Sequence, residues 1–132
     1  WECRGFWVNE GPAVMVHGDK LFISYSASAT DENYCMGLLW IDLDADPLNQ
    51  QNWHKSPRPV FTTSYENRQF GPGHNSFTQT PEGEDVLVYH ARNYTEIEGD
   101  PLYDPNRHTR LKLVRWDENG MPDFGIPPAD TN

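Results

Sequence analysis

The sequence predicts an all-β fold in which short strands are joined by many turns. Glycine and proline are dense, with 10 Gly and 11 Pro among 132 residues, as is typical of chains that turn often. Apolar residues form short runs bounded by turn residues, and helical periodicity is weak throughout. Hydrophobic residues make up only 36% of the chain and aromatic residues reach 13%, which suits short strands better than a helical bundle.

The first half of the chain contains the signals of four strands. Ala13–Val16 and Leu21–Ser26 flank the turn residues His17–Asp19, so the two runs predict a β-hairpin. Met36–Leu43 predicts a third strand. Pro59–Phe61 predicts a short fourth strand at a sheet edge, because proline lacks the amide proton that a central strand donates.

The second half shows the same succession of signals. Asn75–Thr80 and Asp85–Ala91 predict two strands joined by a turn, and residues 93–106 form a long loop with glycine and proline. Thr109–Trp116 predicts a third strand, and Phe124–Ile126 predicts a last short one.

The two halves also share sequence. Tyr25-Ser26-Ala27 recurs as Tyr89-His90-Ala91, and Gly11-Pro12 recurs as Gly71-Pro72. Units of about four strands that recur in this way are typical of β-propeller blades. The offsets alone leave a β-sandwich with two similar meanders as an equal alternative.

On the propeller interpretation, the chain is a single partial β-propeller of about two blades. Residues 1–66 form the first blade with its N-terminal segment, and residues 67–132 form the second blade and a C-terminal tail. Two blades do not close a ring, because each blade packs both of its faces against neighbours. We therefore expect exposed apolar faces, together with self-association or a complementary propeller fragment.

Charge and cysteine content exclude several classes of partner. The formal charge is −10, from 20 acidic and 10 basic residues, so nucleic acid is not expected to bind. No stretch approaches the roughly 20 apolar residues of a membrane span, so no membrane partner is expected. Cys3 and Cys35 are the two cysteines, for which one disulfide or two free thiols are the alternatives. The chain starts at Trp1 without a signal-type segment, and its true beginning is expected upstream.

Glu10 is the first candidate for chemistry. It lies in Asn9-Glu10-Gly11-Pro12, where Gly-Pro predicts a tight turn that holds the carboxylate at the mouth of a blade. Phe6 and Trp7 are close in sequence, and an apolar neighbourhood favours the protonated acid that can donate to a leaving group. A carboxylate that only accepts backbone hydrogen bonds in the turn is the alternative.

His74 is the second candidate. It lies in Gly71-Pro72-Gly73-His74-Asn75-Ser76, which matches the position of Glu10 one repeat later. We expect His74 to start the innermost strand of its blade and to point to the central channel. One histidine does not hold a metal alone, so further ligands would be waters or residues elsewhere. A hydrogen-bonded core histidine is the alternative.

Nearly the whole chain resembles glycoside hydrolase family 43, and its arabinofuranosidases in particular. The stretches that carry the resemblance are GFWVNEGPAV (5–14), FISYSASATDENYCMGLL (22–39), FGPGHNSF (70–77), VLVYHARNY (86–94) and DPLYDPNRHTR (100–110). The resemblance implies a five-bladed β-propeller, of which this chain is the C-terminal part. It also implies an inverting hydrolase with three acidic residues in a central cleft.

The resemblance assigns roles to individual residues. Glu10 corresponds to the general acid, and His74 to a histidine that approaches a central calcium ion directly or through water. Arg107 is similar to an arginine that lines the sugar site. Trp7 and Asn9, which precede Glu10, are expected to contact the sugar as well.

Two further acidic residues of the family, an aspartate base and an aspartate that tunes the acid, lie on earlier blades and have no counterpart here. Inversion needs an acid and a base about 6.5–9.5 Å apart, so complete activity is expected only with the missing blades. We therefore expect a fragment or split subunit of an α-L-arabinofuranosidase, with arabinose-containing oligosaccharides or polysaccharides as ligands. A non-catalytic carbohydrate-binding or self-assembling propeller-derived protein is the alternative. Localisation stays open between a secreted or periplasmic bacterial parent and a cytoplasmic one.

Overall fold

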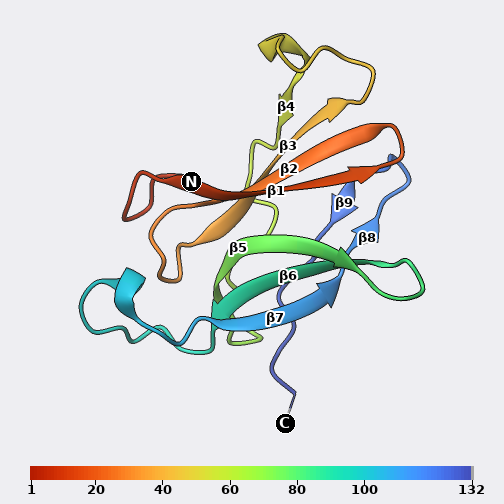
Figure 1. Cartoon of the computed structure of the whole chain (residues 1–132). Coiled ribbons are helices and arrows are strands. Elements are labelled where there is room, and N and C mark those ends of the chain that lie inside the picture. The colour runs from red at the N-terminus through yellow and green to blue at the C-terminus, as the bar shows by residue number, and fades with distance from the viewer. Residues whose placement is uncertain (132) are drawn as a thin grey trace.

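The computed structural model describes residues 1–131, which form two antiparallel sheets and a small hairpin (Figure 1). The first sheet has the strand order β1-β2-β3-β4, and its strands are β1 (Asn9–His17), β2 (Lys20–Ala27), β3 (Cys35–Asp42) and β4 (His54–Lys55). The second sheet has the order β5-β6-β7, with β5 (Phe70–Gln79), β6 (Asp85–Arg92) and β7 (His108–Leu113). The hairpin consists of β8 (Arg115–Trp116) and β9 (Pro122–Asp123). Two 3₁₀ turns, η1 (Gln50–Asn52) and η2 (Pro101–Tyr103), lie in the loops.

The strands predicted at the start of each half form where expected. The hairpin of β1 and β2 turns at Gly18, and both strands extend beyond the predicted bounds. In the first half the fourth strand was placed wrongly, because β4 is His54–Lys55 and Phe61 makes only an isolated bridge to Met36. The chain around Phe61 still runs along β3, since the Val60 amide donates to the Met36 carbonyl at 2.8 Å.

In the second half the prediction of one strand over 109–116 was wrong. β6 begins at Asp85, whose carbonyl accepts a hydrogen bond from the Val114 amide, so residues after Val114 have no partner on β6. The chain turns away at this point and continues as β8. The last strand, β9, precedes the predicted Phe124–Ile126. Phe124 is instead buried in the core, where its carbonyl accepts a bond from Lys112 Nζ.

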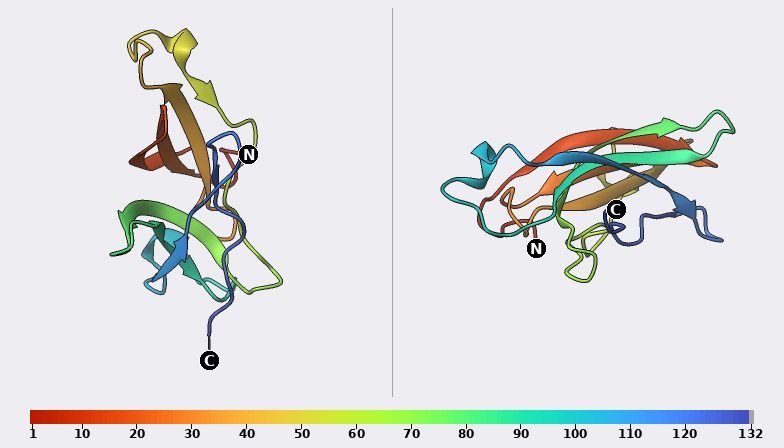
Figure 2. Two further views of the ribbon diagram at one scale, coloured as in Figure 1. Left: turned by 90° about the vertical axis from the view of Figure 1, so that its right-hand side faces the viewer. Right: turned by 90° about the horizontal axis from the view of Figure 1, so that it is seen from below.

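The core lies between the two sheets, which Figure 2 shows as separate layers. Strand alternation puts Phe22 and Leu38 of the first sheet on the same side as Met15, and all three are buried. Tyr89 of the second sheet meets Phe61 edge to face, with ring centroids 4.9 Å apart and an interplanar angle of 89°. The interface between the sheets is therefore a continuous hydrophobic core.

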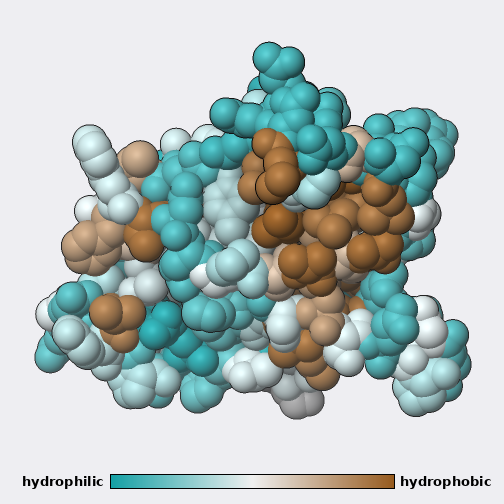
Figure 3. All heavy atoms as spheres, turned by 45° about the horizontal axis from the view of Figure 1, so that its top comes forward, coloured by the Kyte–Doolittle hydropathy of each residue, from teal (hydrophilic) through white to brown (hydrophobic). Residues whose placement is uncertain are grey.

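Part of the outer face of each sheet is exposed and apolar. On the first sheet this face carries Val14 and Val16, which are 59% and 55% exposed. On the second it carries Leu111 and Leu113, which are 62% and 47% exposed. Figure 3 shows hydrophobic residues gathered on one side of the molecule. The exposed apolar faces expected for an open pair of blades are thus present.

Three other predictions concern the chain as a whole. Cys3 is exposed and Cys35 is buried, and both are free thiols, so the disulfide alternative is not realised. Within residues 1–131, no helix has the length and apolar character needed to cross a membrane. The first sheet lies before residue 67 and the second after it, while the boundary between blades at residues 66 and 67 stays a prediction.

Candidate active site

The first strand of each sheet bulges at its Gly-Pro pair. The pairing of β1 with β2 shifts register between Glu10 and Ala13, and β5 shifts against β6 on both sides of Gly73. Gly11 and Gly71 have left-handed φ values of 59° and 63°, which glycine adopts without a steric penalty. The predicted tight turn before the strand is therefore wrong, since Gly-Pro forms a β-bulge inside β1. Such bulges redirect neighbouring side chains.

The two bulges bring Glu10 and His74 together. Oε2 of Glu10 lies 3.0 Å from Nδ1 of His74, and Oε1 accepts a hydrogen bond from the hydroxyl of Tyr34. His74 has a left-handed φ of 43°, and its amide donates to Ser26 Oγ at 2.7 Å. A non-glycine residue held in this conformation is strained, and such strain gathers at functional sites. The His74 side chain is 58% exposed, which excludes the alternative of a buried core histidine.

A cavity of about 570 Å³ opens beside this pair and is lined by residues of both sheets and of the long loop. Its lining includes Glu10, His74 and Arg107, so three of the predicted site residues converge on one hollow. Trp7 is 89% exposed and, like Asn9, does not line it. The remaining lining residues are Phe6, Val8, Ser28, Thr30, Tyr34, Asp100 and Leu102.

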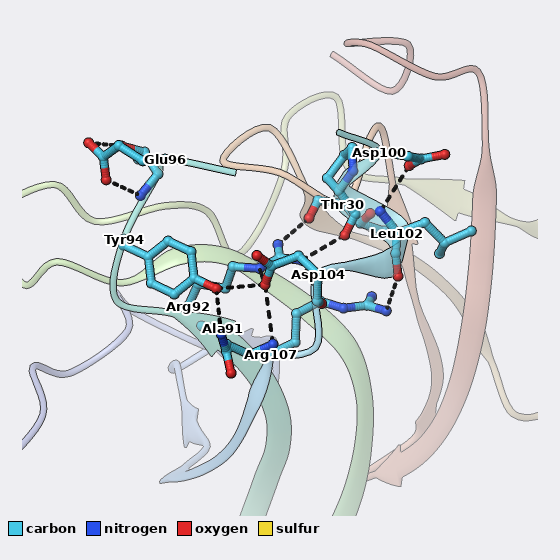
Figure 4. Close-up of polar contacts among 12 residues, drawn as sticks. Thr30, Ala91, Arg92, Tyr94, Glu96, Asp100, Leu102, Asp104 and Arg107 are labelled. Atoms are coloured by element: carbon cyan, nitrogen blue, oxygen red, sulfur yellow. Dashed lines mark hydrogen bonds and ion pairs between the residues drawn. The ribbon is translucent and has the colours of Figure 1, made fainter. Parts of the chain in front are cut away.

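Arg92 at the end of β6 holds the loop that carries Arg107 to the cavity (Figure 4). Its side chain is 2% exposed and forms an ion pair with Asp104 at 2.8 Å. The same guanidinium donates to the Pro101 carbonyl at 2.7 Å and to the Thr30 carbonyl of the first blade. Tyr94 donates to Asp104 Oδ1 at 2.6 Å, and this bond, followed by the ion pair with Arg92, lowers the pKa of Asp104.

The electrostatics around the cavity favour a neutral His90 and a cationic Arg107. Burial lowers the pKa of His90 to about 4, and the positive charges of Arg107, His74 and Arg92 act in the same direction. Burial and then Arg92 lower the pKa of Arg107, while Glu10 opposes this shift. Arginine stays charged at neutral pH, so the cavity offers the cation of Arg107 and the carboxyl groups of Glu10 and Asp100 to a polar ligand.

Residues 1–131 contain no cluster of acidic, histidine or cysteine side chains that could hold calcium. Calcium takes about six to eight oxygen ligands. Among residues 1–131, no three His, Cys, Asp or Glu side chains gather closely enough to hold an ion. His74 offers a nitrogen, and its Nδ1 already lies 3.0 Å from Glu10. The expected calcium contact through His74 therefore needs oxygen ligands from water or from outside these residues.

Several residues that line the cavity were missed from the sequence, among them Tyr34 and Leu102. Tyr34 touches Glu10 although it lies between two strands, and only the β2–β3 register and the loop between them put it there. Leu102 reaches the cavity from η2, in a loop that gave no periodic signal. The signal that found Glu10 and His74 was the repeated Gly-Pro pair, which directly follows Glu10 and lies just before His74.

The comparisons with known proteins agree on one family. The family model described as glycosyl hydrolases family 43 matches residues 1–122. An extracellular exo-α-(1→5)-L-arabinofuranosidase of Streptomyces avermitilis is 60% identical over 131 residues, which is 98% of this chain and 27% of that protein. The α-L-arabinofuranosidase 43 of Humicola insolens is 53% identical over the same shares of both chains.

A solved structure gives the same result for the fold. The crystal structure of α-L-arabinofuranosidase from Lactobacillus brevis superposes with a TM-score of 0.96 and 55% identity, over 100% of this chain and 41% of that one. The predicted fold class, an all-β partial β-propeller of about two blades, is thereby confirmed. The chain spans about a quarter of the length of the curated relatives, 27% for the two named above. Over that span it belongs to glycosyl hydrolases family 43.

Proposed function

We propose that the chain is the acid-bearing part of an inverting α-L-arabinofuranosidase and that Glu10 is the general acid. The observation that carries the proposal is the convergence of Glu10, His74 and Arg107 on one cavity. The relatives named above supply the substrate class, terminal arabinofuranosyl units of arabinose-containing oligosaccharides or polysaccharides. The extracellular relative supports a secreted parent protein.

In this mechanism Glu10 gives its proton to the glycosidic oxygen while the bond between that oxygen and the anomeric carbon breaks. Water attacks the opposite face of the sugar, and its proton goes to a carboxylate base about 6.5–9.5 Å from Glu10. Arg107 lines the same cavity and donates hydrogen bonds to sugar hydroxyls. The chain supplies the acid and part of the sugar site, and a complementary propeller fragment supplies the base.

The experiment is complementation. The part of the Lactobacillus brevis enzyme outside the matched segment is co-expressed with this chain, and hydrolysis of 4-nitrophenyl α-L-arabinofuranoside is measured. Glu10→Gln is expected to lower turnover by about 10²–10⁴-fold, as is typical for loss of a general catalyst. Glu118→Gln, in an exposed turn, is the matched control and is expected to leave turnover unchanged. NMR of the first product anomer reports inversion.

Activity that survives Glu10→Gln would reject the assigned acid. Arabino-oligosaccharide binding without turnover, measured by calorimetry on the assembly, would favour the non-catalytic alternative. Analytical ultracentrifugation of the chain alone tests whether the outer faces with Val16 and Leu111 drive self-association. Calcium enters the proposal only as an ion that His74 contacts through water, and a thermal shift of the assembly on calcium addition, lost in His74→Ala, tests it.

A further inference from the structure

The structure assigns to Tyr34 the role of positioning residue for Glu10, and this inference rests on the proposed function. The Tyr34 hydroxyl donates to Oε1 of Glu10, and His74 lies against Oε2. A carboxyl group whose Oε1 accepts this bond carries its acidic proton on Oε2. Tyr34 thereby decides which oxygen of the general acid faces the leaving group and in which direction its proton points.

The ring of Tyr34 is held rigidly enough for this task. It is 1% exposed and stacks on His90, with centroids 5.6 Å apart and an interplanar angle of 4°. On another side it lies against Gly73, where an added Cβ would be 2.4 Å from Cε1 of the ring. Glycine at this position is therefore needed for the ring to fit, and Gly73 and His90 hold the ring from two sides.

The hydroxyl is the only polar group of the Tyr34 side chain, so its removal tests the bond and not the packing. Tyr34→Phe keeps the ring, the stack on His90 and the fit against Gly73. The other charged or titratable groups that face Glu10 across the cavity are His74, Arg107 and Asp100, and they stay in place. Tyr65→Phe is the matched control, because Tyr65 is 70% exposed and does not line this cavity.

The first measurement uses the chain alone and needs no activity. Glutamate labelled with ¹³C at the side-chain carboxyl gives a signal for Glu10, identified by its loss in Glu10→Gln. Tyr34→Phe is expected to shift this signal, since a charge-assisted hydrogen bond to the carboxylate is lost. Tyr65→Phe is expected to leave it in place. An unshifted signal in Tyr34→Phe overturns the inference, because the bond would then be absent in solution.

The second measurement uses the complemented assembly and substrates of different leaving groups. General acid help matters most when the leaving group is a poor one, such as the sugar alcohol of an arabino-oligosaccharide. Tyr34→Phe is expected to lower kcat for arabino-oligosaccharides about tenfold with KM unchanged, the loss of one charge-assisted hydrogen bond. With 2,4-dinitrophenyl arabinofuranoside, whose leaving group needs little protonation, the change is expected to stay below about twofold.

The outcomes separate the two ideas. If Glu10→Gln is fully active, the proposed function fails. If Glu10→Gln is inactive but Tyr34→Phe slows both substrates equally or neither, the assignment of Tyr34 fails while Glu10 keeps its role. A merely structural effect of Tyr34→Phe would slow both substrates alike and would lower the melting temperature.

Discussion

Gly73→Ala is the sharpest single perturbation of the site, because it adds one methyl group at a measured obstruction. The added Cβ would lie 2.4 Å and 2.7 Å from Cε1 and Cδ1 of Tyr34, and 2.9 Å from Ser26 Oγ. Gly73 does not have a left-handed φ, so alanine meets no backbone penalty there and the whole effect is steric. The Tyr34 ring is buried against His90, so the ring cannot swing away without disturbing the cavity.

The expected cost follows from these contacts. Overpacking of a close-packed site costs about 1–3 kcal/mol. For a chain of this length, 1 kcal/mol lowers the melting temperature by about 4 °C, so a decrease of about 4–12 °C is expected. Because Tyr34 is displaced, the ¹³C signal of the Glu10 carboxyl should move as well.

The assay is thermal unfolding followed by circular dichroism, with Gly83→Ala as control. An added Cβ at Gly83 has nothing within 4 Å, but its φ of 87° costs alanine backbone strain of about 1–2 kcal/mol without touching the site. The control should therefore lower the melting temperature and leave the Glu10 signal unmoved. A Gly73→Ala protein with the melting temperature and the Glu10 signal of the parent chain would refute the assigned packing of Tyr34.

Three further predictions concern the surroundings of the site. Burial lowers the pKa of His90 to about 4 in the folded chain, against about 6.5 in the unfolded chain, so the free energy of unfolding decreases as pH falls from about 6.5 to 4, by up to about 3 kcal/mol. Urea unfolding at pH 7 and 4.5 should show that the free energy of unfolding decreases less in His90→Phe than in the parent chain. An equal decrease in both would contradict a buried neutral imidazole at His90. In Arg92→Lys the lysine cannot form all the hydrogen bonds of the guanidinium, so the rate of amide hydrogen exchange at Leu102 is expected to rise at least about tenfold. The control Arg58→Lys, at an exposed position, is expected to leave this rate unchanged. Val16→Lys places a charge on the exposed outer face of the first sheet, and binding of a hydrophobic dye should decrease; unchanged dye binding would mean that this face is covered.

The sequence predicted most strands of the fold because short apolar runs between turn residues are a local signal. β1, β2, β3, β5 and β6 lie where that signal placed them. The predictions failed at β4, at the split between β7 and β8, and at β9, which precedes the predicted Phe124–Ile126. At these positions the ends of the strands depend on which residues of the neighbouring strand are still available for pairing. The periodicity of a single segment does not contain this information.

Only the part of the site that lies beside the repeated Gly-Pro pair could be predicted from the sequence. Glu10 and His74 were found through the Gly-Pro pair beside each, although the pair proved to form bulges and not turns. Trp7 was expected to contact sugar because it is near Glu10 in sequence, yet its side chain does not line the cavity. Tyr34 was missed for the converse reason, since it is distant in sequence and adjacent only after the strands pair.

The cavity draws Glu10 from the first sheet and Tyr34 from the loop between β2 and β3, while His74 comes from the second sheet and Arg107 from the loop before β7. A sugar that contacts both halves is bound only by molecules in which the sheets are docked, so ligand affinity and blade docking are thermodynamically linked. At a hundredfold excess over Kd such a ligand would strengthen docking by about 2.7 kcal/mol. By the same linkage, a substitution that loosens the contact of Phe61 with Tyr89 would weaken sugar binding from outside the cavity, before any unfolding is visible.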